Sequence, residues 1–174
     1  MDEILKVLKK QCNSDNCIVC GKTAETALGM DFYELEEGVL LGVAKGKFPH
    51  QSYPDRMHGG MITAILDETI CRAVQITDPD IWGVTGKIEV SFKKPVPLGE
   101  TLLCFGKITG LYKLGFTGKG YIEDERGNVL ATATAKYVRT PLEATTSTES
   151  FLWKVFPDST PPESAVIRHP ELLV

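Results

Sequence analysis

One apolar segment with helical periodicity, from residue 61 to about residue 76, constrains the fold of this chain more than any other feature. Its apolar side chains recur at intervals of three and four residues, which is the repeat of one face of an α-helix. That broad face comprises Ile62, Ile65, Leu66, Thr69, Ala73 and Ile76. No other long segment has this pattern, so we expect a single central helix.

The segments on both sides of this helix alternate apolar and polar side chains, which is typical of β-strands. Two antiparallel strands are predicted within residues 29–45, around the turn Glu36-Glu37-Gly38. Four strands are predicted after the helix, at residues 84–92, 102–111, 116–123 and 129–138, and we expect them to form an antiparallel meander. One long helix among about six strands predicts an α+β domain in which an antiparallel sheet wraps the helix.

The length of 174 residues fits one domain with a sizeable core, which we place at residues 29–140. Residues 1–28 are expected to hold a short amphipathic helix, because Ile4, Leu5 and Leu8 have helical spacing, followed by a Cys-containing entry segment. Residues 141–174 are rich in Ser, Thr and Pro. The apolar run at 151–156 nevertheless predicts that this extension packs on its own or a neighbouring subunit.

Charge and the first residues exclude several classes of protein. A formal net charge of −4 with both signs interspersed argues against a nucleic-acid binder, which needs a concentrated Lys/Arg surface. The N-terminus is charged and lacks a continuous apolar run, so it resembles neither a secretory signal nor a membrane span. We therefore expect a cytoplasmic protein without membrane or nucleic-acid partners.

Five cysteines, an odd number, do not suggest a disulfide framework, so reduced thiols are expected. Cys12, Cys17 and Cys20 have C-x4-C-x2-C spacing. A C-x2-C pair can bind zinc, but a structural site needs a fourth ligand and usually a second close pair, which the sequence lacks. We predict no metal site here, and a turn that ends at Gly21.

Two glycines, Gly59 and Gly60, stand where a loop enters the central helix. The backbone N–H groups at a helix start are free, and the helix dipole adds positive potential, which suits a developing oxyanion. Glycines here would also allow a tight entry for a closely packed helix, and the sequence does not separate the two interpretations.

Asp67 is harder to explain as a structural residue. Its neighbours three and four positions away are Ala64, Thr63, Ile70 and Cys71, so its carboxylate is expected to be at least partly buried. Glu68, by contrast, has Arg72 four residues on, which predicts an ordinary solvated ion pair. Asp67 is therefore the better candidate for a nucleophile or general base.

The spacing of Gly59 and Asp67 bears on assembly. Eight residues separate them, which corresponds to roughly 12 Å of helical rise. One subunit cannot easily bring both groups to one carbonyl, so we expect them to meet across a two-fold axis at a dimer interface.

The segments HGGMITAILDET and GVTGKIEVSFKKPVPLGE resemble the phenylacetate-pathway type of hotdog acyl-CoA thioesterases. The lead-in HQSYPDRMHGG and the segment NCIVCGKTAETALGM are also similar to parts of these proteins, so the resemblance covers roughly residues 17–138. It implies a hotdog fold and an acyl-CoA hydrolase that assembles as a homodimer, often as a dimer of dimers, without a metal or redox cofactor.

The resemblance also implies roles for particular residues. Asp67 corresponds to the acidic nucleophile or general base and Gly59 to the oxyanion donor. His58 corresponds to the histidine that opens the motif, although it could equally cap the helix. Thr85 corresponds to a Ser or Thr hydroxyl near the catalytic water or the carboxylate, although threonine is common in strands. Where some members place an Asn or Gln that orients substrate or water, this chain has Ser52, with Gln51 beside it.

Substrate contacts are expected from Gly60, which lets a ligand carbonyl approach closely, and from Lys93 and Lys94, which could bind coenzyme A phosphates or simply be solvated. Two other functions remain open. One is a non-catalytic module that binds acyl-CoA. The other is a hydratase or dehydratase of enoyl or hydroxyacyl thioesters, with His58 and Glu68 as acid and base. The sequence does not indicate the acyl group.

Overall fold

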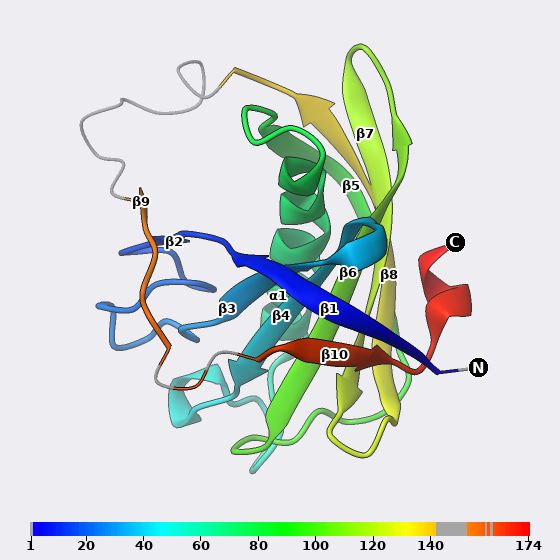
Figure 1. Ribbon diagram of the computed structural model, residues 1–174. Helices are drawn as coiled ribbons and strands as arrows, with labels where there is room; N and C mark the ends of the chain where they lie inside the picture. The colour runs from blue at the N-terminus through cyan, green and yellow to red at the C-terminus, as the bar shows by residue number, and fades with distance from the viewer. Residues whose placement is uncertain (1, 142–152, 159, 161) are drawn as a thin grey trace.

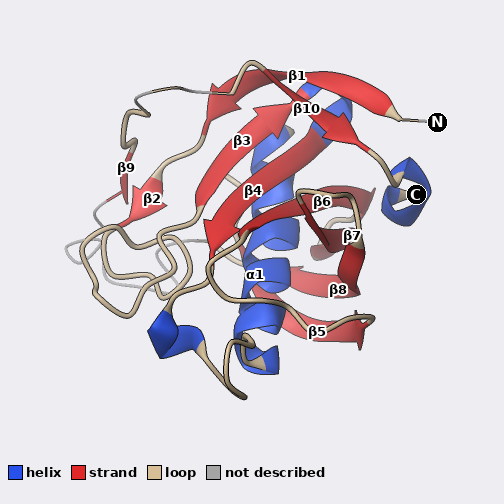
Figure 2. Cartoon of the chain, turned by 90° about the horizontal axis from the view of Figure 1, so that it is seen from below, coloured by secondary structure: helices blue, strands red, loops and turns tan. Residues whose placement is uncertain are grey.

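The central helix lies against one face of a long, curved antiparallel sheet in the computed structural model, which describes residues 2–141, 153–158, 160 and 162–174 (Figures 1 and 2). Helix α1 spans Gly59–Arg72 and continues as the 3-10 turn η3, Ala73–Ile76. Both the single helix of the 61–76 segment and the wrapped sheet are confirmed. None of the described helices is long and apolar enough to cross a membrane.

Eight strands form the sheet in the order β10-β1-β3-β4-β6-β7-β8-β5. They are β1 (Glu3–Lys10), β3 (Asp31–Leu35), β4 (Val39–Lys45), β5 (Gly83–Phe92), β6 (Thr101–Leu111), β7 (Gly115–Asp124), β8 (Val129–Arg139) and β10 (Ser164–Ile167). A separate pair joins β2 (Asn13–Ser14) to β9 (Trp153–Lys154).

The expected four-stranded meander is wrong for β5. Strands β6, β7 and β8 are successive neighbours, but β5 pairs with β8 at the edge of the sheet. Helix α1 and strand β5 come between β4 and β6 in the chain, and β6 then pairs with β4, so these two neighbouring strands are not consecutive in sequence. Alternation of side chains predicts strands, but it does not say which strands become neighbours.

Glycines in the middle of the sheet let the helix approach its backbone. A Cβ at Gly106 of β6 would lie 2.9 Å from the Thr69 carbonyl oxygen, and a Cβ at Gly120 of β7 would lie 2.8 Å from Ile70. Helix α1 therefore rests directly on strands β6 and β7. The core between helix and sheet is built from buried residues of both, among them Ile65, Leu66, Leu40, Leu102, Ile122 and Ala133.

The predicted N-terminal helix is wrong, because residues 3–10 form strand β1. Leu5 is buried, while Ile4 is 71% exposed and Leu8 62% exposed, so the three residues do not share one buried face. Short apolar runs are ambiguous between helix and strand. Here the pairing of β1 with β3 on one side and β10 on the other determines the outcome.

The C-terminal segment packs on the outer face of the sheet (Figure 1). Strand β10 and the 3-10 turn η6 (Pro170–Leu173) place Ile167 and Leu173 in a second core with Tyr33, Leu41, Phe105 and Tyr121. Of the apolar run at 151–156, residues 151 and 152 lie outside the described residues.

Candidate active site

His58 holds the start of α1. Its backbone is extended, and its Nδ1 accepts a hydrogen bond of 2.8 Å from the Gly60 N–H. This is a helix cap, one of the two roles that the sequence left open for His58. The Gly60 N–H is thereby engaged, whereas the Gly59 N–H donates to no acceptor among the described residues. Gly59 is thus the glycine of the two with a donor to offer a ligand.

Asp67 lies in the second half of α1, where strands β5 and β8 meet the helix. The Thr85 hydroxyl is 3.0 Å from both carboxylate oxygens of Asp67. The Tyr137 hydroxyl is 3.1 Å from Oδ1 and 3.0 Å from the Asp67 backbone carbonyl. Thr85 and Tyr137 are direct cross-strand partners, so the register of β5 on β8 brings both hydroxyls to one carboxylate.

The surroundings of Asp67 act on its pKa in opposite directions. Partial burial raises the pKa, and the nearby charge of Glu68 adds to this effect. Hydrogen bonds from Thr85 and Tyr137 stabilise the ionised form and oppose the rise, but the net pKa is still above the usual value of an aspartate. A carboxylate that is desolvated and still oriented by two hydroxyls is suited to general-base or nucleophilic chemistry.

Tyr137 was not among the residues expected from the sequence. The inward face of β8 carries Ala131, Ala133 and Ala135 before it reaches Tyr137, and all four are buried. A tyrosine that follows a row of alanines on a buried face needs a hydrogen-bond partner for its hydroxyl, which is a usable signal. The identity of the partner depends on strand register and cannot be read from the sequence.

A second group of expected residues lies at the other end of α1. A pocket of about 470 Å³ there is lined by Ser52, Gly59, Lys93 and Lys94, together with Tyr53, Arg56, Met57, Ile62, Phe92, Pro95 and Val96. Three of these side chains are basic and none is acidic, so the pocket is suited to an anionic group such as a phosphate.

Two of the expected binding residues have contacts of their own. The Gln51 side chain accepts a hydrogen bond from the Asp55 N–H, which closes the loop before the helix, and Gln51 does not line the pocket. Lys94 donates to Asn128 Oδ1 at 2.8 Å across the neighbouring hairpin. Substrate contacts of Gln51, Ser52, Gly60, Lys93 and Lys94 stay predictions.

The Asp67 cluster and the Gly59 pocket are separate within one chain. Helix α1 has 14 residues, which is roughly 21 Å of rise, and the two groups lie toward opposite ends of it. Within one chain, the carboxylate therefore lies apart from the Gly59 N–H and the basic side chains around it.

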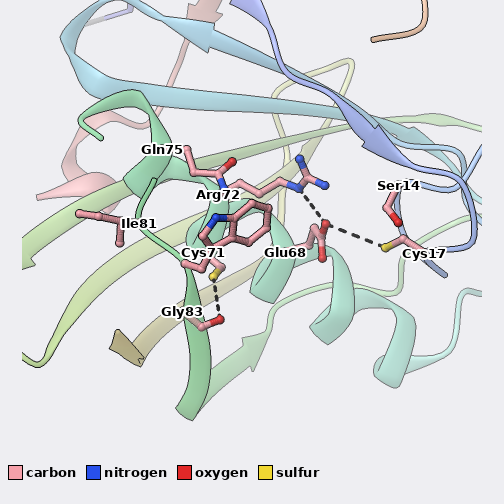
Figure 3. Close-up of a pocket in the computed structure, with 9 residues that line it drawn as sticks. Ser14, Cys17, Glu68, Cys71, Arg72, Gln75, Ile81 and Gly83 are labelled. Atoms are coloured by element: carbon pink, nitrogen blue, oxygen red, sulfur yellow. Dashed lines mark hydrogen bonds and ion pairs between the residues drawn. The ribbon is translucent and has the colours of Figure 1, made fainter. Parts of the chain in front are cut away.

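A third cluster surrounds Glu68, and here the expectation of a solvated ion pair is wrong. Arg72 Nε is 2.7 Å from Glu68 Oε1, as predicted, but the Arg72 side chain is only 6% exposed and that of Glu68 27%. The N-terminal segment covers this face of the helix, and Arg72 also donates to the Cys12 carbonyl and lies over the Phe32 ring. A pocket of about 300 Å³ borders the cluster (Figure 3). Its lining comprises Ser14, Cys17, Glu68, Cys71, Arg72, Gln75, Ile81, Trp82 and Gly83.

One central helix wrapped by an antiparallel sheet is the hotdog fold, here with a carboxylate on the helix, and the comparisons with known proteins agree. Residues 55–138 match the model of the Thioesterase superfamily. No curated protein sequence matches the chain. The matched segment contains the helix, the Asp67 cluster and four strands, which confirms the sequence resemblance to hotdog thioesterases.

Several solved structures share the fold. A thioesterase superfamily protein is 25% identical, with a TM-score of 0.58 over 65% of this chain and 55% of that one, so the chain spans just over half of that relative. The PaaI protein of E. coli, from the phenylacetic acid degradation operon, is 19% identical, with a TM-score of 0.60 over 66% of this chain and 81% of that one. A Streptococcus mutans protein bound to acetyl-CoA is 22% identical, with a TM-score of 0.58 over 64% of this chain and 89% of that one.

Proposed function

We propose that this protein is an acyl-CoA thioesterase, which hydrolyses a thioester to a free acid and coenzyme A. The observation that carries the proposal is the Asp67 carboxylate, partly buried and held by the hydroxyls of Thr85 and Tyr137. The family match and a structural neighbour with acetyl-CoA bound support a CoA thioester as the substrate. A cytoplasmic location suits such a substrate.

The chemistry requires a nucleophile, an oxyanion donor and little else. A thiolate leaves readily, so catalysis depends on positioning and on stabilising the charge that develops on the carbonyl oxygen. In the proposed mechanism the Gly59 N–H donates to that oxygen. Asp67 either attacks the carbonyl carbon or removes a proton from the attacking water, and neither route needs a metal or redox cofactor.

We place the complete site between two subunits. Within one chain, Gly59 and Asp67 are separated by roughly 12 Å of helical rise, which is too far for one carbonyl to contact both. Strand β5 forms one edge of the sheet, and its residues Val84 and Phe92 are 49% and 55% exposed. An exposed strand edge beside the Asp67 cluster can pair with its own copy across a two-fold axis. A homodimer, or a dimer of dimers, would then unite Gly59 of one chain with Asp67 of the other.

The test is release of free thiol from short, medium, long and aryl acyl-CoAs by the wild type and by Asp67→Asn. We expect the wild type to release thiol from at least one of them and Asp67→Asn to lose about a thousandfold in kcat, because the base or nucleophile is gone. Glu125→Gln, which changes an exposed acid on the β7–β8 hairpin, is the matched control.

The alternatives predict different results. A wild type that binds acyl-CoA but releases no thiol would indicate a binding module. Hydration of an enoyl-CoA without thiol release would indicate a hydratase. Full activity in Asp67→Asn would reject the assignment of Asp67.

A further inference from the structure

Cys17 and Cys20 face each other in a tight turn beside α1. The Gly21 N–H closes the turn on the Cys17 carbonyl at 2.8 Å. The N–H groups of Val19 and Cys20 each lie 3.4 Å from Cys17 Sγ. The two sulfur atoms and a carboxylate oxygen of Glu68 all lie within 4.8 Å of one another. A disulfide needs the sulfurs at about 2 Å, so its formation would require the two side chains to move toward each other.

The two cysteines differ in exposure and in their partners. Cys17 is partly exposed and lines the 300 Å³ pocket, and Figure 3 shows its sulfur directed toward Glu68. Cys20 is fully buried, and its sulfur accepts a hydrogen bond of 3.2 Å from Arg72 Nη2. An accessible sulfur next to a protected one is the arrangement of an attacking thiolate and its resolving thiol.

The electrostatics of the turn favour a thiolate at Cys17. The Cys20 thiol and the backbone N–H groups lower the pKa of Cys17 to about 7, although burial and the charge of Glu68 oppose this. The same sulfur–sulfur contact, with burial, raises the pKa of Cys20, although the charge of Arg72 opposes this rise, and Cys20 keeps its proton. Near neutral pH a substantial part of Cys17 is therefore thiolate, while Cys20 stays protonated.

Arg72 argues against a metal ion at the same place. Its guanidinium contacts Glu68 Oε1 at 2.7 Å and Cys20 Sγ at 3.2 Å, so it occupies two of the three groups that would have to bind the ion. Its charge cannot be removed at ordinary pH, and the side chain is buried and held by the Cys12 carbonyl and the Phe32 ring. A cation among these groups would be repelled by the arginine.

We propose that Cys17 and Cys20 form a redox-active dithiol that reacts with hydrogen peroxide. The Cys17 thiolate attacks one peroxide oxygen. An S–O bond forms as the O–O bond breaks, and the departing hydroxide takes up a proton and leaves as water. The Cys20 sulfur then attacks the Cys17 sulfenic acid. The S–S bond forms as the S–O bond breaks, and the Cys20 proton leaves in a second water. Two electrons pass from the sulfurs to the peroxide.

The first measurement is peptide mapping of the reduced full-length protein after treatment with hydrogen peroxide. We expect a disulfide between Cys17 and Cys20, with the loss of two hydrogen atoms from the intact mass and its recovery under a reductant. In Cys20→Ser the sulfenic acid at Cys17 should persist and be trapped by dimedone. Cys12 is the matched control, because it lies in the same segment and is also partly exposed. Iodoacetamide should alkylate Cys17 about fivefold faster at pH 7 than at pH 6, because the pKa of Cys17 lies at about 7 and only the thiolate reacts.

Two results would overturn the proposal. One is peroxide treatment that leaves both thiols free, or that links Cys17 to Cys12 in place of Cys20. The other is tight binding of one zinc ion per chain, measured with zinc chloride on the reduced protein, lost in Cys17→Ser and protective against peroxide. The readouts are masses and thiol reactivity, so they are independent of whether the protein hydrolyses acyl-CoA.

Discussion

Asp67 carries its charge at a cost to the folded state. Its pKa is raised on folding, so between the unfolded and folded pKa values the folded protein binds more protons than the unfolded chain. Stability therefore falls as pH rises through this interval, and at neutral pH the ionised group is a net burden. Folding stability alone therefore does not explain an ionisable acid at position 67.

The direction of the pKa shift of Asp67 predicts how Asp67→Asn should affect the stability of the protein. The amide can still accept hydrogen bonds from Thr85 and Tyr137, and it removes the buried charge. We expect the melting temperature at pH 7 to stay equal or rise, with the difference from the wild type shrinking as pH falls below the raised pKa. A melting temperature several degrees lower than the wild type at pH 7 would contradict this account.

The Tyr137 hydroxyl should lower the pKa of Asp67. Tyr137→Phe removes one hydroxyl that stabilises the ionised form of Asp67, so the pKa of Asp67 should rise further. We expect the acid limb of the pH–kcat/KM profile for thioester hydrolysis to move to higher pH, and kcat to fall about tenfold, the scale of one hydrogen bond to a charged group.

Tyr33→Phe is the control for that experiment. The Tyr33 hydroxyl contacts Asp158, outside the Asp67 cluster, so its loss should leave the pH profile in place. An unchanged acid limb in Tyr137→Phe would mean that this hydroxyl does not act on the catalytic carboxylate.

At the scale of elements, the C-terminal strand is held to the sheet by a buried acid. Glu123 of β7 is 0% exposed, and Arg168 Nη1 lies 2.5 Å from its carboxylate. His169 approaches the other oxygen at 3.7 Å. Burial still raises the pKa of Glu123 despite these partners. The ion pair therefore fixes the position of the C-terminal segment more than it adds to the net stability of the fold.

Removing one partner of that pair should be costly. Arg168→Ala leaves Glu123 buried without its guanidinium, and we expect the free energy of unfolding to fall by about 2 kcal/mol, below the range for a fully buried pair because Arg168 is partly exposed. Urea unfolding at pH 7 measures this. Arg126→Ala, on the hairpin between β7 and β8, is the control and should change stability little. Equal losses in both variants would show that Arg168 does not anchor the segment.

Experiments on the assembled protein can test whether one active site needs residues from two chains. Gly59→Pro removes the proposed oxyanion donor, and proline is tolerated at the first position of a helix. His58, just before it, already has φ −65° and ψ 138°, the conformation that a following proline requires. A Cβ at position 59 would meet only the Phe92 ring at 3.5 Å, an ordinary contact.

Mixed dimers of Gly59→Pro and Asp67→Asn then test the two-chain site. Each variant alone should be inactive. After unfolding and refolding together, about half of the dimers are mixed, and each mixed dimer has one intact site, so about a quarter of wild-type activity should return. The double variant refolded with Asp67→Asn is the control and should recover nothing. No recovery in the first mixture would mean that each chain works with its own Gly59 and Asp67.

The features that could be predicted from the sequence were local ones. The periodicity at 61–76 predicted α1, and alternation predicted the paired strands around it, because both patterns reflect which side chains must face a core. Asp67 was identifiable because a carboxylate on a weakly polar helical face is costly to bury, which indicates a functional role. His58 and Gly59 were identifiable because helix starts leave backbone donors unpaired.

The remaining features depend on which distant segments of the chain meet in space, and the sequence did not predict them. Pairing with β3 and β10 made residues 3–10 a strand. The register of β5 on β8 placed Tyr137 beside Thr85, and so beside Asp67. The N-terminal segment buries Arg72 against Cys20, so the helical ion pair of Glu68 and Arg72 also contacts a thiol. Contacts between residues far apart in the chain leave no periodic trace in it, so no local pattern could predict them.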